Sequence, residues 1–408
     1  MMRLTTLASG LKIATRTMPG VETVAVSLHA EAGSRHEPAR LNGIAHLFEH
    51  MVFKGAGGRG AREISEAIED VGGDLNACTE RDATSFSASL LAEHLPLGIE
   101  LLADMALRPH FKAEDLQREK EVVLQELGEA RDTPSDIIFD ELWMAAYPDQ
   151  PLGRSILGDE TSIAAISVDD LEGWRASHYH AQGLTLVAAG KVDHEALVAL
   201  AEARFADLGQ GATAAPAPAC FGGGARRVRG RADQAHLALA YAGPAQLDAD
   251  FYPARFFADL VGGGASSRLF QAVREERGLA YSIWASLHPY RDAGIFHVYA
   301  ATARREAGAA SALVAEVIAK AAKDATQREL DRVRAQAKAG LLMSLESSWG
   351  QASYVARQLA VRGRLVEPAE VVAELEAVTL DQVRAAGAKM LAGARASATI
   401  GVPAAKAA

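Results

Sequence analysis

Residues 209–224 read G-Q-G-A-T-A-A-P-A-P-A-C-F-G-G-G and form the clearest break in a chain of 408 residues. A stretch rich in glycine, proline and alanine, without an apolar period, is typical of a surface linker. It leaves two halves of nearly equal length, 1–208 and 225–408. We therefore predict two domains joined by a linker, and halves of equal length prompt a search for an internal repeat.

Matching segments recur in the two halves about 211 residues apart. The strand-like residues 84–88 correspond to 295–299, and the helix-opening residues 167–171 correspond to 379–383 one residue out of step. These matches indicate duplication of one unit. Two unrelated domains with a similar order of strands and helices are the alternative.

Strands are grouped with strands and helices with helices in each half, which favours the α+β class over alternating β-α-β units. The predicted helices 97–107 and 307–321 each carry apolar residues at three- and four-residue spacing, as expected for a helix lying on a sheet. The predicted fold is two tandem homologous domains, each a mainly antiparallel sheet packed with helices.

Composition excludes several classes of protein. A net charge of −10 argues against nucleic-acid binding, and no apolar run approaches the ~18 residues of a membrane-spanning helix. Two cysteines, Cys78 and Cys220, are too few for a disulfide framework and suit a reducing compartment. Residues 1–18 lack the apolar block of a secretory signal and are expected to fold as strands, so we expect a cytoplasmic protein.

The pentapeptide His46-Leu47-Phe48-Glu49-His50 is the strongest chemical signal in the sequence. Residues four apart share one face of a helix, so His46 and His50 can direct imidazole nitrogens at one zinc ion. Glu49 lies beside them on that face, where it can reach a metal-bound water without being a ligand. An amphipathic helix whose histidines cap or pack is the structural alternative.

A catalytic zinc needs a third protein ligand, and the acidic helical block 114–129 contains two candidates. Glu119 and Glu126 are seven residues apart and share a predicted buried face with Val122 and Val123. Their Cα atoms would lie about 10 Å apart along the helix axis. One of them is therefore expected to bind the metal and the other to hydrogen-bond a ligand.

The order H-x-x-E-H, followed by Glu126 76 residues after His50, strongly resembles the pitrilysin/insulinase zinc metallopeptidases. Within that family the sequence looks most similar to the mitochondrial processing peptidase β subunit and its bacterial homologues. The resemblance implies that His46, His50 and Glu126 bind zinc and that Glu49 is the general base. It also implies that Glu119 supports the site as the carboxylate seven residues before the ligand.

The same resemblance implies roles for residues outside the zinc motif. The family places an arginine and a tyrosine seven residues apart in the second half, and Arg274 and Tyr281 match this pattern. Their implied role is to bind substrate carbonyl groups and the oxyanion of the tetrahedral intermediate. Asn76 and Ala77 match the edge strand that aligns the substrate backbone.

Only the first half carries the metal motif. At the repeat offset, His46, Glu49, His50 and Glu126 correspond to Phe257, Leu260, Val261 and Ala337. Since every polar group of the site is apolar in the second copy, one Zn²⁺ per chain is expected.

The resemblance implies a zinc endopeptidase that cleaves peptides or presequence-like segments inside a chamber. Relatives build this chamber from two bowl-shaped halves of two repeats each, so a chain with two repeats implies a dimer. A homodimer is expected, and a heterodimer with a zinc-less sister subunit is the alternative. A non-catalytic core-type subunit of a larger assembly is the alternative function, although such subunits have typically lost the motif.

Overall fold

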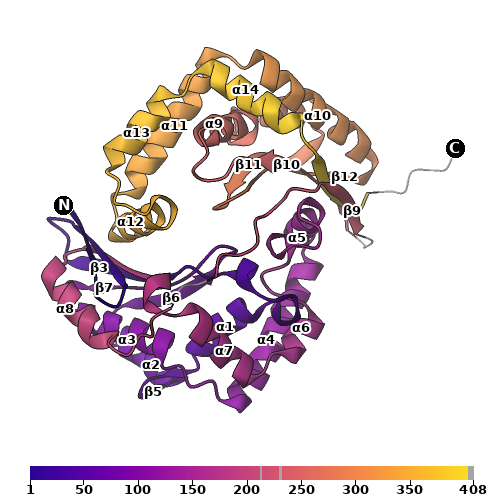
Figure 1. Cartoon of the computed structure of the whole chain (residues 1–408). Helices are drawn as coiled ribbons and strands as arrows, with labels where there is room; N and C mark the ends of the chain where they lie inside the picture. Colours follow the sequence, from indigo (N-terminus) through magenta and orange to yellow (C-terminus); the bar gives the residue numbers. More distant parts are fainter. Residues whose placement is uncertain (212–213, 229–231, 403–408) are drawn as a thin grey trace. The chain divides into compact units, whose positions relative to one another are not determined.

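The computed structural model describes residues 1–211, 214–228 and 232–402 (Figure 1). Residues 212 and 213 of the predicted linker lie outside the described part, as do 229–231 and 403–408 of the predicted second domain. The chain packs into two compact units, each assembled from three segments. Unit 1 comprises Met1–Leu127, Ser155–Ala217 and Leu341–Val366, and unit 2 comprises the described residues of Gly128–Arg154, Pro218–Gly340 and Glu367–Ala408.

Unit 1 is built on a six-stranded sheet with the order β1-β2-β8-β3-β7-β6. All neighbouring strands are antiparallel except β2 and β8, which run parallel. The strands are β1 (Met2–Thr6), β2 (Lys12–Thr17), β3 (Thr23–Ala30), β6 (Asp74–Thr79), β7 (Thr84–Leu91) and β8 (Leu184–Gly190). Every residue of β8 is buried, because helices cover both faces of the sheet centre.

The helices of unit 1 and a two-stranded ribbon surround this sheet. Helices α3 and α8 pack on one face, and α12 packs across β2, β3 and β8 (Figure 1). The helices are α1 (Ile44–Val52), α2 (Ala61–Glu69), α3 (Leu95–Leu107), α4 (Ala113–Asp132), α6 (Glu160–Ala165), α7 (Val168–His178), α8 (His194–Arg204) and α12 (Ser348–Arg362), and the ribbon joins β4 (Gly55–Ala56) to β5 (Arg59–Gly60). The last turn of α4, from Gly128, is assigned to unit 2.

Unit 2 has a five-stranded sheet with the order β11-β12-β10-β13-β9, in which only β13 and β9 run parallel. The strands are β9 (Gly224–Val228), β10 (Gln234–Gly243), β11 (Ala280–Pro289), β12 (Gly294–Ala303) and β13 (Arg395–Ile400). The helices are α5 (Pro134–Ala146), α9 (Phe251–Gly262), α10 (Ala307–Asp324), α11 (Gln327–Ser344), α13 (Pro368–Ala377) and α14 (Leu380–Leu391), with a π-helical turn at Phe270–Glu275. The last turn of α11, from Leu341, is assigned to unit 1.

The two sheets share one strand order. The order β6-β7-β3-β8-β2 in unit 1 corresponds to β11-β12-β10-β13-β9 in unit 2. In both sheets the first two strands form an antiparallel hairpin, and the last two strands run parallel. This agreement confirms the predicted α+β class with two related domains, each a mixed sheet with helices. The predicted helices 97–107 and 307–321 are confirmed within α3 and α10.

Equivalent helices of the two repeats are exchanged between the packing units. Helix α5 comes from the first half of the sequence but packs on β9, β10 and β13, while α12 from the second half packs on the sheet of unit 1. Ile138, Leu142 and Trp143 of α5 are buried in one cluster with residues of β10 and β13. The domains predicted from the sequence, 1–208 and 225–408, describe repeats along the chain. The two packing units differ from these repeats at α5 and α12.

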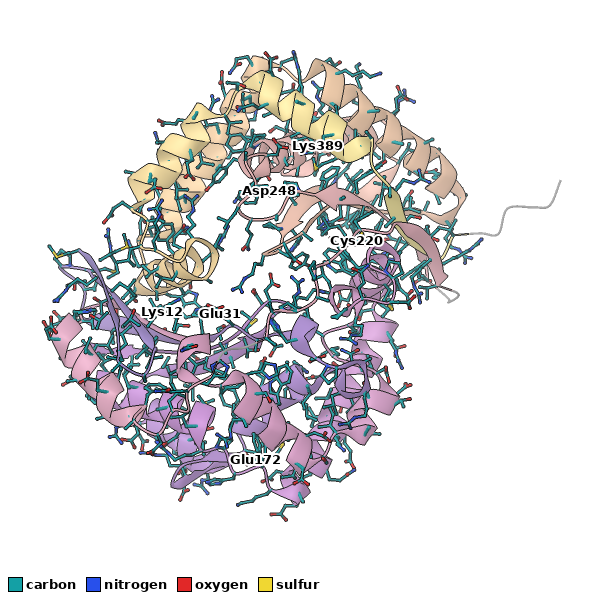
Figure 2. All side chains as sticks on the ribbon, in the orientation of Figure 1. Lys12, Glu31, Glu172, Cys220, Asp248 and Lys389 are labelled. Atoms are coloured by element: carbon teal, nitrogen blue, oxygen red, sulfur yellow. The ribbon has the colours of Figure 1, made fainter. Side chains whose placement is uncertain are left out.

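The segment predicted as a linker contains no helix or strand before Gly224 in its described residues. Cys220, labelled in Figure 2, exchanges two hydrogen bonds of 2.7 Å with the Gln150 side chain within unit 2. Within the described part of the chain, no helix combines the length and the apolar character needed to cross a membrane.

Candidate metal centre

Helix α1 presents His46, Glu49 and His50 on the one face that it does not bury. The opposite face packs into the core of unit 1 through Ile44, Leu47, Phe48 and Met51, all fully buried. The helix begins after Gly43, whose φ of +93° and close approach to Leu157 and Gly158 leave no room for a side chain. The i, i+3, i+4 spacing then places the three polar side chains together, as expected from the sequence.

The start of α1 is capped from a distance by the buried carboxylate of Glu37. This side chain accepts hydrogen bonds from the Gly43 and Ala45 backbone amides, at 2.8 and 2.9 Å, and from Asn42 Nδ2 at 2.8 Å. Glu37 thus replaces the N-cap side chain that glycine lacks, and its negative charge lies at the positive end of the helix.

Helix α4 brings a third potential ligand to the two histidines. Glu126 Oε2 lies 3.6 Å from His50 Nε2 and 3.9 Å from His46 Nε2. Leu116 and Val123 anchor this helix in the core of unit 1, and Leu127 is also buried. The expectation that Val122 shares the buried face is wrong, since Val122 is 41% exposed.

The three side chains fit a zinc ion. Their ligand atoms lie within 4.8 Å of one another, and this is the one such group found among His, Cys, Asp and Glu side chains of the described residues. Bonds of about 2.1 Å in a tetrahedral site separate ligand atoms by about 3.4 Å, and the distances from Glu126 Oε2 to His50 Nε2 and His46 Nε2, 3.6 and 3.9 Å, exceed this by a few tenths of an ångström. Glu126 Oε2 is buried without a hydrogen-bond partner in the described part of the chain, as expected of an oxygen that binds a metal.

Burial favours the neutral form of His46 that a metal requires. Desolvation, with a smaller contribution from the neighbouring His50, lowers the pKa of His46 from 6.5 to about 4. At neutral pH its imidazole therefore keeps a free lone pair, and protons compete little with a metal there.

Glu119 holds His50 from behind. Its Oε2 lies 3.1 Å from His50 Nδ1, which leaves Nε2 facing Glu126, and its Oε1 forms an ion pair of 2.8 Å with Lys54 Nζ. Glu119 is 6% exposed, so the ion pair with Lys54 offsets the cost of burying its charge. A carboxylate on the second nitrogen of a ligating histidine orients the ring and makes it more basic.

Glu49 lies next to the three potential ligands and is held by strand β6. Thr79 Oγ1, at the end of β6, donates a hydrogen bond of 2.5 Å to Glu49 Oε2. Burial raises the pKa of Glu49, while the Thr79 hydrogen bond and the nearby His50 oppose this rise. A carboxylate with a raised pKa beside a metal site is a candidate general base.

Asn76 and Ala77 lie in the middle of β6, which is the edge strand of the unit 1 sheet. Within the described residues β6 pairs with no strand other than β7, and the Ala77 amide donates a hydrogen bond of 2.9 Å to Asn76 Oδ1, which an added strand would have to displace or bypass. Asn76 is exposed and Ala77 is half-buried.

Arg274 and Tyr281 come together in unit 2, each at a local irregularity of the backbone. Arg274 lies in the π-helical turn, and Tyr281 is the extra residue of a bulge between Ala280 and Ser282 in edge strand β11. The Arg274 guanidinium lies 4.6 Å from the ring centre of Phe270 and 5.6 Å from that of Tyr281, which is 76% exposed. π-Turns and edge bulges are common where a protein redirects side chains for function.

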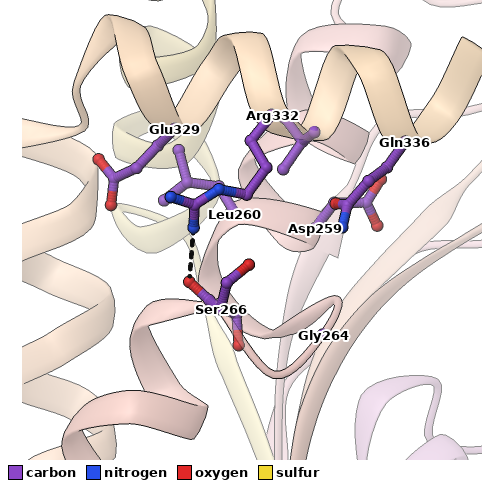
Figure 3. Close-up of a pocket in the computed structure, with 9 residues that line it drawn as sticks. Asp259, Leu260, Gly264, Ser266, Glu329, Arg332 and Gln336 are labelled. Carbon is purple, nitrogen blue, oxygen red and sulfur yellow. Dashed lines mark hydrogen bonds between the residues drawn. The ribbon is translucent and has the colours of Figure 1, made fainter.

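A small polar pocket of unit 2 shows how the segment before Arg274 is fastened (Figure 3). Residues of α9 and α11 line it together with the loop around Ser266 and Ser267. Arg332 of α11 donates a hydrogen bond of 3.0 Å to the Ser266 carbonyl oxygen (Figure 3). Arg268 binds Glu329 through two hydrogen bonds, at 2.6 and 2.7 Å, so the loop is tied to α11 on both sides of Ser267.

The positions equivalent to the metal motif in the second repeat are apolar and packed. Phe257, Leu260 and Val261 of α9 are each at most 3% exposed. Helix α9 is thus the equivalent of α1 in the second repeat, with buried apolar side chains at the positions of His46, Glu49 and His50.

Comparison with known proteins identifies the family. The family model described as Insulinase (Peptidase family M16) matches residues 12–160, and the model described as Peptidase M16 inactive domain matches 165–337. An uncharacterized zinc protease of Rickettsia bellii is 33% identical over 97% of this chain and 96% of its own. The chain belongs to the M16 (insulinase) family. It is a zinc protease of this family, and His46, His50 and Glu126 form its candidate metal site.

Other M16 proteins agree with this assignment. An uncharacterized zinc protease of Bacillus subtilis is 33% identical over 94% of both chains. The crystal structure of a peptidase M16 inactive domain from Pseudomonas fluorescens matches the whole chain with a TM-score of 0.92 at 23% identity, covering 99% of that chain. A protease from Helicobacter pylori matches 98% of the chain with a TM-score of 0.91 at 21% identity. These two structures establish the fold.

Three residues of the site were not found from the sequence: Glu37, Lys54 and Thr79. Glu37 caps the helix that carries the motif, Lys54 pairs with Glu119, and Thr79 donates a hydrogen bond to Glu49. Thr79 ends the strand that contains Asn76, but nothing in one sequence pairs that strand with α1. Only the register of the folded elements brings these side chains to the site.

Proposed function

We propose that this M16 protease is a zinc endopeptidase with the bacterial processing-peptidase type of site. The observation that supports this most is the convergence of His46, His50 and Glu126, with Glu49 beside them. The equivalent positions of the metal motif in the second repeat are buried and apolar. His46, His50 and Glu126 would hold one zinc ion per chain. When bound, zinc lowers the pKa of a water toward about 7 and polarises a peptide carbonyl.

The residues of the chain would share the remaining work. Glu49 accepts the proton of the attacking water and delivers it to the leaving amine. The edge of β6 at Asn76 and Ala77 aligns an extended peptide by strand addition. Arg274 and Tyr281 bind substrate carbonyl groups and the developing oxyanion.

Replacement of Glu49 by glutamine tests this proposal. The change keeps the size of the side chain but removes the base, so zinc should stay bound while kcat/KM for a quenched fluorescent peptide falls at least about 100-fold. Glu121→Gln, at an exposed position of α4, is the matched control. Retained turnover by a zinc-loaded Glu49→Gln protein would contradict the mechanism, and a wild-type chain that binds no zinc and cleaves nothing would favour a non-catalytic subunit.

The proposed substrates are peptides or presequence-like segments enclosed in a chamber formed by two chains. A homodimer is self-sufficient because one chain carries both the zinc motif and the Arg274–Tyr281 pair, and a heterodimer with a zinc-less sister subunit is the alternative. Light scattering of the purified chain tests this, and a monomer with full activity would contradict the chamber. Cleavage-site profiling on a peptide library would identify the sequences that are cut.

A further inference from the structure

We propose that Thr79 is a positioning residue for Glu49, linking the substrate-aligning edge strand to the general base. This inference rests on the proposed role of Glu49 and adds a residue that the motif does not contain. It follows from one contact, the hydrogen bond of 2.5 Å from Thr79 Oγ1 to Glu49 Oε2.

The alternation of β6 directs Thr79 at the metal helix. Side chains two residues apart share a face of a strand, so Leu75, Ala77 and Thr79 face one way while Asn76 and Cys78 face the other. The burial of β6 follows this alternation, and α1 packs against the strand. Thr79 is 8% exposed, and its hydroxyl has a second, longer contact of 3.4 Å with the Ala45 carbonyl oxygen of α1.

Such a contact restricts the conformation of Glu49, whose side chain is half-buried. A glutamate has three rotatable bonds, whereas threonine is branched at Cβ and has a restricted χ1. The Thr79 hydroxyl donates to Oε2, and the Thr79 backbone N–H also hydrogen-bonds to the carboxylate, so this one residue restrains the plane of the carboxylate. A displacement of about 1 Å in a reacting group lowers a rate by about 100-fold, so the fixed orientation matters for turnover.

The position of Thr79 also connects two parts of the site. It lies two residues after Ala77 on the strand proposed to align the substrate, and it pairs with Thr84 across the β6–β7 hairpin. A peptide added to the edge of β6 is thereby placed in fixed register with the residue that holds the base.

The test compares three variants of the full chain loaded with zinc. Thr79→Val keeps the shape but removes the hydroxyl, so kcat should fall about 10- to 100-fold while KM and the zinc dissociation constant stay within about twofold. Thr79→Ser keeps the hydroxyl and should recover most of the loss. Thr84→Val is the control, because Thr84 donates to the Ala32 carbonyl oxygen at 2.9 Å and its loss should lower thermal stability without lowering kcat.

The outcomes separate this inference from the proposed function. Equal kcat for Thr79→Val and the wild type, with Glu49→Gln inactive, would overturn the role of Thr79 and leave the function intact. A fall in kcat that is the same in Thr79→Ser and Thr79→Val, or that follows the loss of thermal stability seen in Thr84→Val, would also overturn it. An active Glu49→Gln protein would instead contradict the function itself.

Discussion

Replacing Glu119 by glutamine should weaken zinc binding while leaving every proposed ligand in place. Glu119 is 6% exposed and its Oε2 lies 3.1 Å from His50 Nδ1. Glutamine keeps the size but loses the charge and replaces one acceptor oxygen with a donor nitrogen. A hydrogen bond to a charged group contributes about 1.5–3 kcal/mol, and 1.4 kcal/mol is a tenfold change in an equilibrium constant. The zinc dissociation constant should therefore rise about 10- to 100-fold, the range known for partners of ligating histidines.

A competition titration against a chromogenic zinc chelator at fixed pH measures this effect directly. Glu121→Gln is the matched control, because Glu121 is exposed on the same helix α4. Thermal unfolding of the zinc-free proteins shows whether the substitution also disturbs the fold, since Lys54 loses its partner but remains 35% exposed and can be hydrated. A dissociation constant within twofold of the wild type would refute the proposed support of His50 by Glu119.

Two predictions concern unit 2. Phe270→Leu should lower kcat/KM about two- to fivefold, because an exposed cation–π contact such as that of Phe270 with Arg274 contributes about 0.5–1 kcal/mol. Phe270→Tyr keeps the aromatic ring and should preserve activity. Equal kcat/KM values for the two variants would contradict the stacking role. Burial, with the nearby His288, lowers the pKa of His297 from 6.5 to about 3. The unfolded chain then binds more protons at this site between these pH values, so the free energy of unfolding should fall as the pH drops through this window. His297→Phe should flatten that dependence in urea titrations of the zinc-free protein, and an unchanged slope would show that the ring is not responsible.

Local patterns in the sequence were sufficient for the class of fold and for the helix that carries the motif. Apolar spacing predicted helices at 97–107 and 307–321, and both exist. The same reasoning failed at Val122, because seven-residue spacing defines a line along a helix but not how wide the buried face around it is. Helix α4 buries Val123 and exposes its neighbour.

The exchange of α5 and α12 between the units had no sequence signal. Each helix packs on one sheet, and an apolar stripe in the sequence does not say which sheet covers it. Chain connectivity suggested that each half would fold on itself. Which helix packs on a sheet depends on the side chains on the surface of that sheet. This surface forms only when strands distant in the sequence have paired.

The sequence by itself determined the chemistry of this protein: two imidazoles and a carboxylate on one turn of a helix, a second acidic helix, and a repeat that lacks them. Spacing along a helix is a local property, so these features follow from residue order alone. Tertiary structure alone decided which atoms meet: Glu126 against the histidines, Glu119 between His50 and Lys54, and Thr79 on Glu49. Those contacts join elements far apart in the chain, and their geometry depends on how helices and strands pack against the shared core.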